Sequence, residues 1–147
     1  DEPGVNSRLD EIQAAVLRAR LPLVPSWTAR RRERAARYRA ALASAPVSVP
    51  PERDPGHVYH LFVVRSAARD ALRAHLAAQG IETLIHYPIP LPEQPAFAAA
   101  LPAACPEAAR ACRELVSLPL HPALPLETID LVAGAVRAFT PATADRR

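Results

Sequence analysis

A histidine and a tyrosine stand side by side where an apolar segment gives way to a proline-rich one. His86 and Tyr87 follow the segment Ile-Glu-Thr-Leu-Ile at residues 81–85, in which three of five residues are apolar, and prolines recur through residues 88–95. Loops that leave the end of a strand commonly carry binding groups, and prolines stiffen such a loop. An imidazole and a phenol both form hydrogen bonds to ligand oxygens. The alternative is that both rings pack the loop onto the domain, and the sequence leaves the two interpretations open.

The other residues with chemical potential form no recognisable catalytic or metal-binding set. Ser66 and Ser117 lack a histidine–carboxylate arrangement that can be read from the sequence. Cys105 and Cys112 have neither Cys-x-x-Cys nor His-x-x-x-His spacing around them, so we expect no metal site. On one helix these cysteines would lie about 10.5 Å apart along the axis. That exceeds the roughly 7 Å limit between the Cα atoms of a disulfide, so we expect them to be reduced.

The elements that position these residues begin with a long helix predicted over residues 7–44. Apolar residues repeat on one of its faces at spacings of three and four, at Leu9, Ile12, Val16 and Leu17. Prolines at positions 22 and 25 predict a break near residues 20–25, because an internal proline costs about 3 kcal/mol. After the break, the predicted buried face consists of Trp27, Ala35, Tyr38 and Leu42. The arginines at positions 30, 31, 32 and 34 are predicted to form the solvated face.

The remainder alternates short strands with helices. Strands are predicted at 58–65, 81–85 and 116–118, with one more around 47–49, and helices at 66–79, 106–115 and 126–139. This order predicts the α+β (α/β) class, with a short β-sheet flanked by helices. We expect a kinked helix over residues 1–44, a small α+β domain over 45–140, and a frayed tail over 141–147.

Composition narrows the classes of partner. The chain of 147 residues carries a net charge of +3, and every positive side chain is arginine because lysine is absent. A basic nucleic-acid-binding domain is one alternative, which steep salt dependence of binding would reveal. The arginine run has no interleaved aromatic residues to stack bases, so we expect no nucleic-acid partner. No apolar run reaches the 18 residues of a membrane span and no secretory leader is visible, so we expect a cytoplasmic protein.

Six segments resemble, in order and spacing, the C-terminal part of the DegT-like nucleotide-sugar aminotransferases, which have fold type I. They cover residues 4–17, 27–32, 59–65, 80–83, 86–91 and 118–122, and together they span about 120 residues. The Asn-Ser-Arg-Leu-Asp-Glu sequence at residues 6–11 is similar to the subgroup that acts on dTDP-keto-6-deoxysugars. The resemblance implies a long helix that links a separate cofactor domain to a small C-terminal domain.

The resemblance also implies roles for four residues. Asn6 resembles an asparagine that crosses a dimer interface to the phosphate of the neighbour's pyridoxal phosphate (PLP). A side-chain amide suits this role, because it donates a hydrogen bond to a phosphate oxygen and does not titrate. Arg8 adds charge toward the same phosphate or the sugar diphosphate. His86 and Tyr87 resemble a pair on the substrate side, near the sugar.

Structural alternatives remain for the two residues near the start of the chain. Asn6 or Ser7 can be a helix N-cap. Arg8 can form a surface ion pair with Asp10 or Glu11. The family often has a histidine where Pro92 stands, so one polar contact to the substrate is in doubt.

The implied activity is transfer of an amino group, from glutamate, to a nucleotide-linked keto-deoxysugar, with PLP as cofactor. Such enzymes hold PLP through a lysine as a Schiff base, and arginine cannot substitute because it stays protonated. This chain has no lysine, so we expect it to be inactive alone and to contribute no catalytic residue of its own. The expected partner is a second copy in a homodimer or a complementing N-terminal chain. The alternative is a non-catalytic remnant or regulatory subunit that pairs with a full-length aminotransferase.

Overall fold

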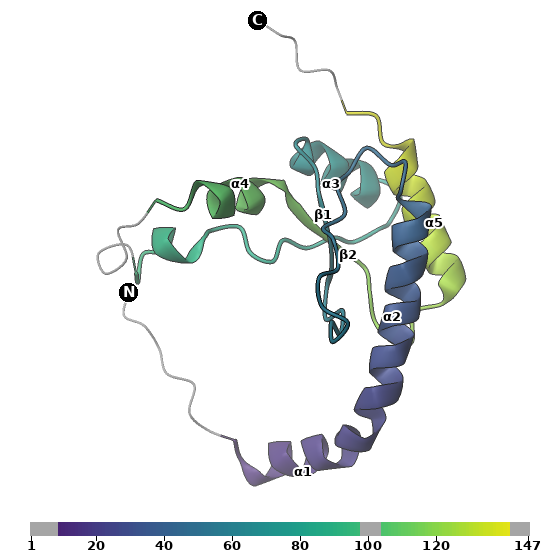
Figure 1. Ribbon diagram of the computed structural model, residues 1–147, viewed down its shortest axis with the longest axis vertical. Coiled ribbons are helices and arrows are strands. Elements are labelled where there is room, and N and C mark those ends of the chain that lie inside the picture. The colour runs from purple at the N-terminus through teal and green to yellow at the C-terminus, as the bar shows by residue number, and fades with distance from the viewer. Residues whose placement is uncertain (1–8, 98–103, 142–147) are drawn as a thin grey trace, which may run out of the picture.

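The computed structural model describes residues 9–97 and 104–141. In chain order its elements are α1 (Glu11–Arg20), the 3-10 turn η1 (Leu21–Leu23), α2 (Val24–Ala41), β1 (Phe62–Arg65), α3 (Arg69–Ala77), the 3-10 turn η2 (Leu91–Glu93), α4 (Pro106–Glu114), β2 (Leu115–Leu118) and α5 (Leu126–Ala138) (Figure 1). The expected α+β class is confirmed. The division into domains at residue 44 stays a prediction, and nearly all of the tail expected to fray lies outside the described residues.

The first helix breaks where the prolines predict. A 3-10 turn at Leu21–Leu23 separates α1 from α2, and the chain changes direction there (Figure 1). The predicted cap at Asn6 or Ser7 is wrong for this helix. Asp10 is the N-cap, and its carboxylate accepts a hydrogen bond from the backbone N–H of Gln13 at 3.2 Å.

Two short strands form the sheet. β1 and β2 pair antiparallel, with Phe62 opposite Leu118 and Arg65 opposite Leu115. Single bridges extend this pair on both sides, because Ser48 pairs with Arg65 and Leu84 pairs with Ser117. β2 therefore lies between β1 and the Leu84 segment.

Three predicted strands are shorter in the structure than in the sequence pattern. Residues 47–49 and 81–85 each contribute one bridge instead of a full strand. The strand expected from residue 58 begins at Phe62, because Tyr59 takes a left-handed backbone with φ of 50°. The backbone N–H of Tyr59 donates to Nδ1 of His57 at 3.0 Å, which ties it to the preceding turn instead of a neighbouring strand.

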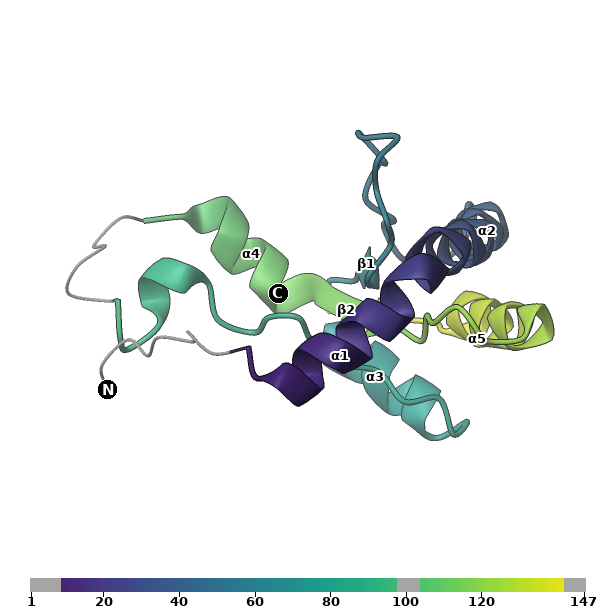
Figure 2. The same cartoon turned by 90° about the horizontal axis from the view of Figure 1, so that it is seen from below.

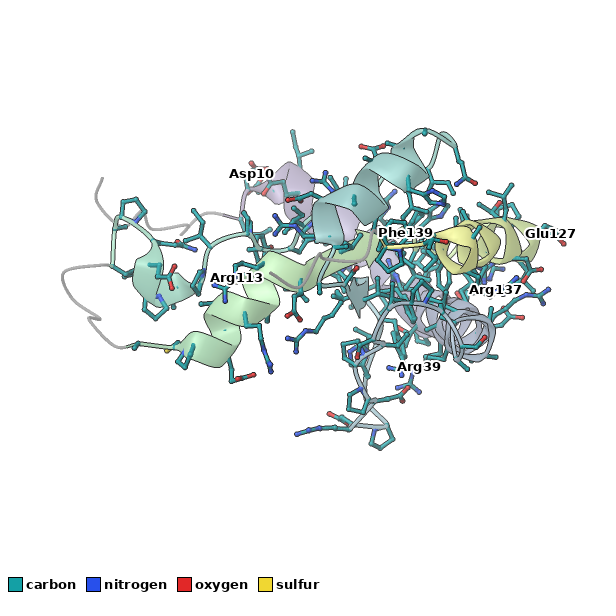
Figure 3. All side chains as sticks on the ribbon, turned by 90° about the horizontal axis from the view of Figure 1, so that it is seen from above. Asp10, Arg39, Arg113, Glu127, Arg137 and Phe139 are labelled. Atoms are coloured by element: carbon teal, nitrogen blue, oxygen red, sulfur yellow. The ribbon has the colours of Figure 1, made fainter. Side chains whose placement is uncertain are left out.

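The core lies between the sheet and three helices. Side chains of α2, α3 and α5 crowd together here, with Phe139 closing the end of α5 (Figure 3). Tyr38 stacks on Phe62 with ring centroids 4.7 Å apart, which joins α2 to β1. Leu72 and Val132 bring α3 and α5 into the same cluster. This core fixes the sheet, and the sheet carries the candidate site.

The predicted faces of α2 are only partly confirmed. Ala35, Tyr38 and Leu42 are buried as expected, whereas Trp27 is half-buried. Arg34, predicted on the solvated face, is buried and donates to the carbonyl oxygen of Leu124 at 2.7 Å. The periodicity of the arginine run could not show this contact, because Leu124 lies 90 residues away in the sequence.

A second part of the chain projects away from the core. The segment 84–97 and α4 leave the sheet on the side opposite to α2 and α5 (Figure 2). Cys105 and Cys112 lie at α4 and are both free. Among the residues that the structure describes, no helix is both long and apolar enough to cross a membrane.

Tyr38 predicts a loss of stability at alkaline pH. Its ring is fully buried, its hydroxyl donates to the carbonyl oxygen of Pro119 at 2.9 Å, and burial raises the pKa of its phenol. The folded chain therefore holds this proton more tightly than the unfolded chain does. Its contribution is complete below about pH 10, the unfolded pKa, and is lost as the pH rises further. We expect the free energy of unfolding to fall above about pH 10 by up to about 1.4 kcal/mol per pH unit from this group.

Urea denaturation of the wild type and of Tyr38→Phe between about pH 8 and about pH 11 measures this effect. The variant should lose about 1 kcal/mol near neutral pH, because the Pro119 carbonyl loses its donor. It should also show a shallower alkaline decline. Identical slopes in the two proteins would contradict the assignment. Some slope remains in the variant because burial also raises the pKa of Tyr59.

Candidate functional site

The candidate site forms where residues 82–86 run beside β2. Ser117 and Leu84 exchange both backbone hydrogen bonds, since N–H of Ser117 donates to the Leu84 carbonyl at 2.8 Å and N–H of Leu84 donates back at 3.3 Å. Ile81 and Thr83 are buried, whereas Glu82 and Leu84 are exposed. This alternation is typical of an extended segment with two different faces.

His86 lies on the same face as Leu84, two residues farther along. Its Nδ1 is 2.9 Å from Oγ of Ser117. The two side chains line a hollow of about 290 Å³ together with Glu82, Leu84 and neighbouring apolar residues. A half-buried imidazole held by a buried hydroxyl thus forms one wall of a small, mainly apolar hollow.

Tyr87 faces a different hollow from its neighbour. Its ring meets the ring of His86 edge-on, with centroids 5.6 Å apart, and the side chain is 69% exposed. It lines a second hollow, of about 340 Å³, together with Pro88, Ile89, Gln94, Pro95 and Ala96. The structure therefore places the predicted pair side by side but on different hollows. His86 is half-buried and Tyr87 is exposed, and the binding roles of both residues stay predictions.

The two predicted cofactor-binding residues cannot be placed. Asn6 and Arg8 lie outside the described residues, so their roles stay predictions. Within residues 9–97 and 104–141, no group of three or more histidine, cysteine, aspartate or glutamate side chains is arranged to hold a metal ion.

The contact between Ser117 and His86 is not a catalytic triad. It uses Nδ1, and among the described residues no carboxylate bonds to the other ring nitrogen. The carboxyl groups with clearly lowered pKa values lie elsewhere, on solvent-facing sides of helices. Hydrogen bonds from Arg69 and Arg37 lower the pKa of Asp70 and Asp130 respectively. The arrangement at His86 can donate or accept a hydrogen bond, but among the described residues it lacks the carboxylate that orients the base of a triad.

The role of Ser117 was missed by sequence reasoning. Its distance from His86 in the sequence is 31 residues, and only the strand pairing brings the two together. A usable signal exists in the alternation of residues 82, 84 and 86, which predicts that Glu82 and His86 share a face. No comparable signal indicates which residue on the neighbouring strand faces them.

Comparison with known proteins decides the family. Residues 1–137 match the DegT/DnrJ/EryC1/StrS aminotransferase family. The chain belongs to this family. The resemblance of the six motifs is thereby confirmed.

The most similar proteins include nucleotide-sugar transaminases. A dTDP-3-amino-3,4,6-trideoxy-alpha-D-glucose transaminase from Streptomyces venezuelae is 47% identical over 142 residues, which cover 92% of this chain and 37% of the relative. A pleiotropic regulatory protein from Geobacillus stearothermophilus is 41% identical, with 92% of this chain and 38% of that protein covered. The structure of S. venezuelae DesV with a ketimine intermediate matches at 46% identity and a TM-score of 0.84, covering 91% of this chain and 37% of DesV. This chain thus spans little more than a third of its relatives and corresponds to their C-terminal part.

The residues present do not by themselves fit PLP. The solved structure of a relative from Bacillus subtilis holds the cofactor PMP. This chain has no lysine amine to hold PLP, and the polar groups around His86 suit ligand oxygens instead of the cofactor's aldehyde. No chemical step through the cofactor is therefore assigned to the described residues.

The exposure of Tyr87 predicts that its side chain is dispensable for folding. We expect Tyr87→Ala to change the free energy of unfolding by less than about 0.5 kcal/mol, as is usual for exposed positions. Leu118→Ala, at a buried position of the adjacent strand, should cost about 2–5 kcal/mol. Urea denaturation of both variants measures the difference. A loss above about 1 kcal/mol in Tyr87→Ala would show that the ring holds the loop in place.

Proposed function

We propose that this chain is the sugar-side part of a PLP-dependent aminotransferase that transfers an amino group from glutamate to a nucleotide-linked keto-deoxysugar. The observation that carries the proposal is the hollow beside β2, where His86 presents an imidazole at the end of an extended segment. Membership of the family and the transaminases among the relatives support the reaction class. His86 and Tyr87 contact oxygens of the sugar nucleotide from different hollows.

Asn6 and Arg8 complete the proposed site from the other end of the chain. In this proposal Asn6 donates to the cofactor phosphate of a neighbouring subunit, and Arg8 adds charge toward that phosphate or the sugar diphosphate. The cofactor, when bound, supplies the carbonyl group that carries the amino group between substrates. The lysine that holds it belongs to a part of the enzyme outside this chain.

The exposed face of α1 supports assembly with that part. Ile12, Val16 and Leu17 are 79%, 50% and 56% exposed, although they lie on one side of α1. Among the described elements, α1 makes its main contacts with η1 alone. An apolar stripe of this kind is typical of a surface that a partner covers. The proposed partner is the N-terminal, cofactor-binding part of the enzyme, present as a complementing chain or within a homodimer.

A regulatory role is the second candidate. The absence of lysine and the 41% identity to a protein named as a pleiotropic regulator favour it. A regulatory chain would bind a full-length aminotransferase through the same α1 face and would not restore or add activity.

A hybrid enzyme tests the proposal. The C-terminal segment of the S. venezuelae transaminase is replaced by this chain, and amino transfer from glutamate to the keto sugar nucleotide is measured. We expect activity, and we expect His86→Ala to raise KM for the sugar nucleotide about 5- to 150-fold, since it removes a hydrogen bond worth about 1–3 kcal/mol. His60→Ala is the matched control, because His60 is an exposed histidine that lines a different hollow.

Two results separate the candidates. A hybrid that folds and binds PLP but transfers no amino group would contradict the aminotransferase proposal. Co-purification of this chain with an intact relative, without any gain in activity, would instead support the regulatory role.

A further inference from the structure

We propose that Ser117 is a positioning residue, which holds His86 as the tautomer with its proton on Nε2 and so presents an N–H donor to an acceptor oxygen of the sugar nucleotide. The identity of the ligand rests on the proposed function. The hydrogen bonding between Ser117 and His86 does not, because it follows from this chain alone.

The backbone around Ser117 is fixed from both sides. Ser117 lies opposite Val63 in the β1–β2 pair and also exchanges two backbone hydrogen bonds with Leu84. Its N–H and its carbonyl are therefore both satisfied. The direction of its side chain is set by the sheet, since successive side chains of a strand point to opposite faces.

The hydroxyl of Ser117 decides the tautomer. Ser117 is 6% exposed, and among the described residues the only hydrogen-bond partner of its Oγ is Nδ1 of His86, at 2.9 Å. If Nδ1 carried the proton, it would donate to Oγ, and no other group within residues 9–97 and 104–141 would accept from the serine O–H. A buried donor left without an acceptor costs about 1–3 kcal/mol. The arrangement that satisfies both groups has the serine O–H donating to an unprotonated Nδ1.

The proton of the neutral imidazole must then lie on Nε2. In neutral imidazole one nitrogen donates and the other accepts, so a hydrogen bond accepted at Nδ1 fixes Nε2–H. His86 lines the hollow beside β2, and within the described part of the chain Nε2 has no hydrogen-bond partner. The ring therefore offers a donor, and the complementary ligand group is an acceptor oxygen: a carbonyl, hydroxyl or diphosphate oxygen.

The strand pairing explains why the Ser117 hydroxyl reaches the ring of His86. Glu82, Leu84 and His86 are every second residue of the segment and line the same hollow. Ser117 pairs directly with Leu84. The diagonal neighbour of a paired residue on the adjacent strand lies within reach of a long side chain. The Leu84–Ser117 bridge thus sets the distance that lets a short hydroxyl reach the imidazole.

Nuclear magnetic resonance of the chain labelled with ¹⁵N at histidine tests the inference. For the neutral ring of His86, we expect the wild type to show a protonated Nε2, an unprotonated Nδ1 and a slowly exchanging serine hydroxyl proton close to the ring. A protonated Nδ1 in the neutral wild-type ring would overturn the proposal.

Two variants of matched shape separate positioning from packing. Ser117→Thr keeps the hydroxyl and should keep both the tautomer and the single ring orientation. Ser117→Val has nearly the same size but no hydroxyl, so its His86 ring should populate more than one orientation and tautomer. A Val variant whose β1 and β2 amide signals are unchanged, and whose ring remains fixed as in the wild type, would also overturn the proposal.

These outcomes are independent of the hybrid enzyme. If His86 is fixed with its proton on Nε2 but the hybrid is inactive, the positioning role of Ser117 is supported and the sugar nucleotide is rejected as the ligand. If the hybrid is active but Nδ1 carries the proton, the proposed function is supported and the positioning role of Ser117 is rejected.

Discussion

The backbone pair between Leu84 and Ser117 is the constraint on which the candidate site depends. It consists of two hydrogen bonds, of 2.8 and 3.3 Å, and it joins a segment without a regular strand to the inner strand of the sheet. Without it the chain after Ile81 would have no fixed register against β2. With it, Leu84 and Ser117 are opposite one another and His86 falls beside the Ser117 hydroxyl. One bridge therefore sets the geometry of a side-chain contact that the sequence separates by 31 residues.

The rest of the fold keeps that bridge in place. Tyr38 stacks on Phe62 of β1, and its hydroxyl bonds to Pro119 directly after β2. These two contacts connect the longest helix to both strands. Arg73 of α3 contacts Thr83 near the bridge, at the long distance of 3.4 Å, so the segment is supported mainly by the sheet and the burial of Ile81 and Thr83. The polar groups proposed for the substrate thus project from a well-packed core into a part of the molecule with few contacts of its own, a common arrangement for binding groups.

The sequence predicted those features of the fold that neighbouring residues determine. The prolines at 22 and 25 predicted the break between α1 and α2. The motifs predicted the family. What the sequence could not show depends on contacts between distant segments. Arg34 is buried by a carbonyl 90 residues away, and Ser117 acquires its partner only through strand pairing. The late start of β1 follows from the contact of Tyr59 with His57, which the β-forming residue types of this segment conceal.

Hydrogen exchange at the backbone amide of Ser117 tests the central claim most directly. This amide donates to the carbonyl of Leu84, so its protection reports on that bridge and not on the pairing of β2 with β1. The account predicts that it exchanges far more slowly than exposed loop amides and approaches the rates found inside α5. Fast exchange at Ser117 while the amides inside α5 remain protected would show that the bridge opens readily, and it would contradict the claim that this pair positions His86.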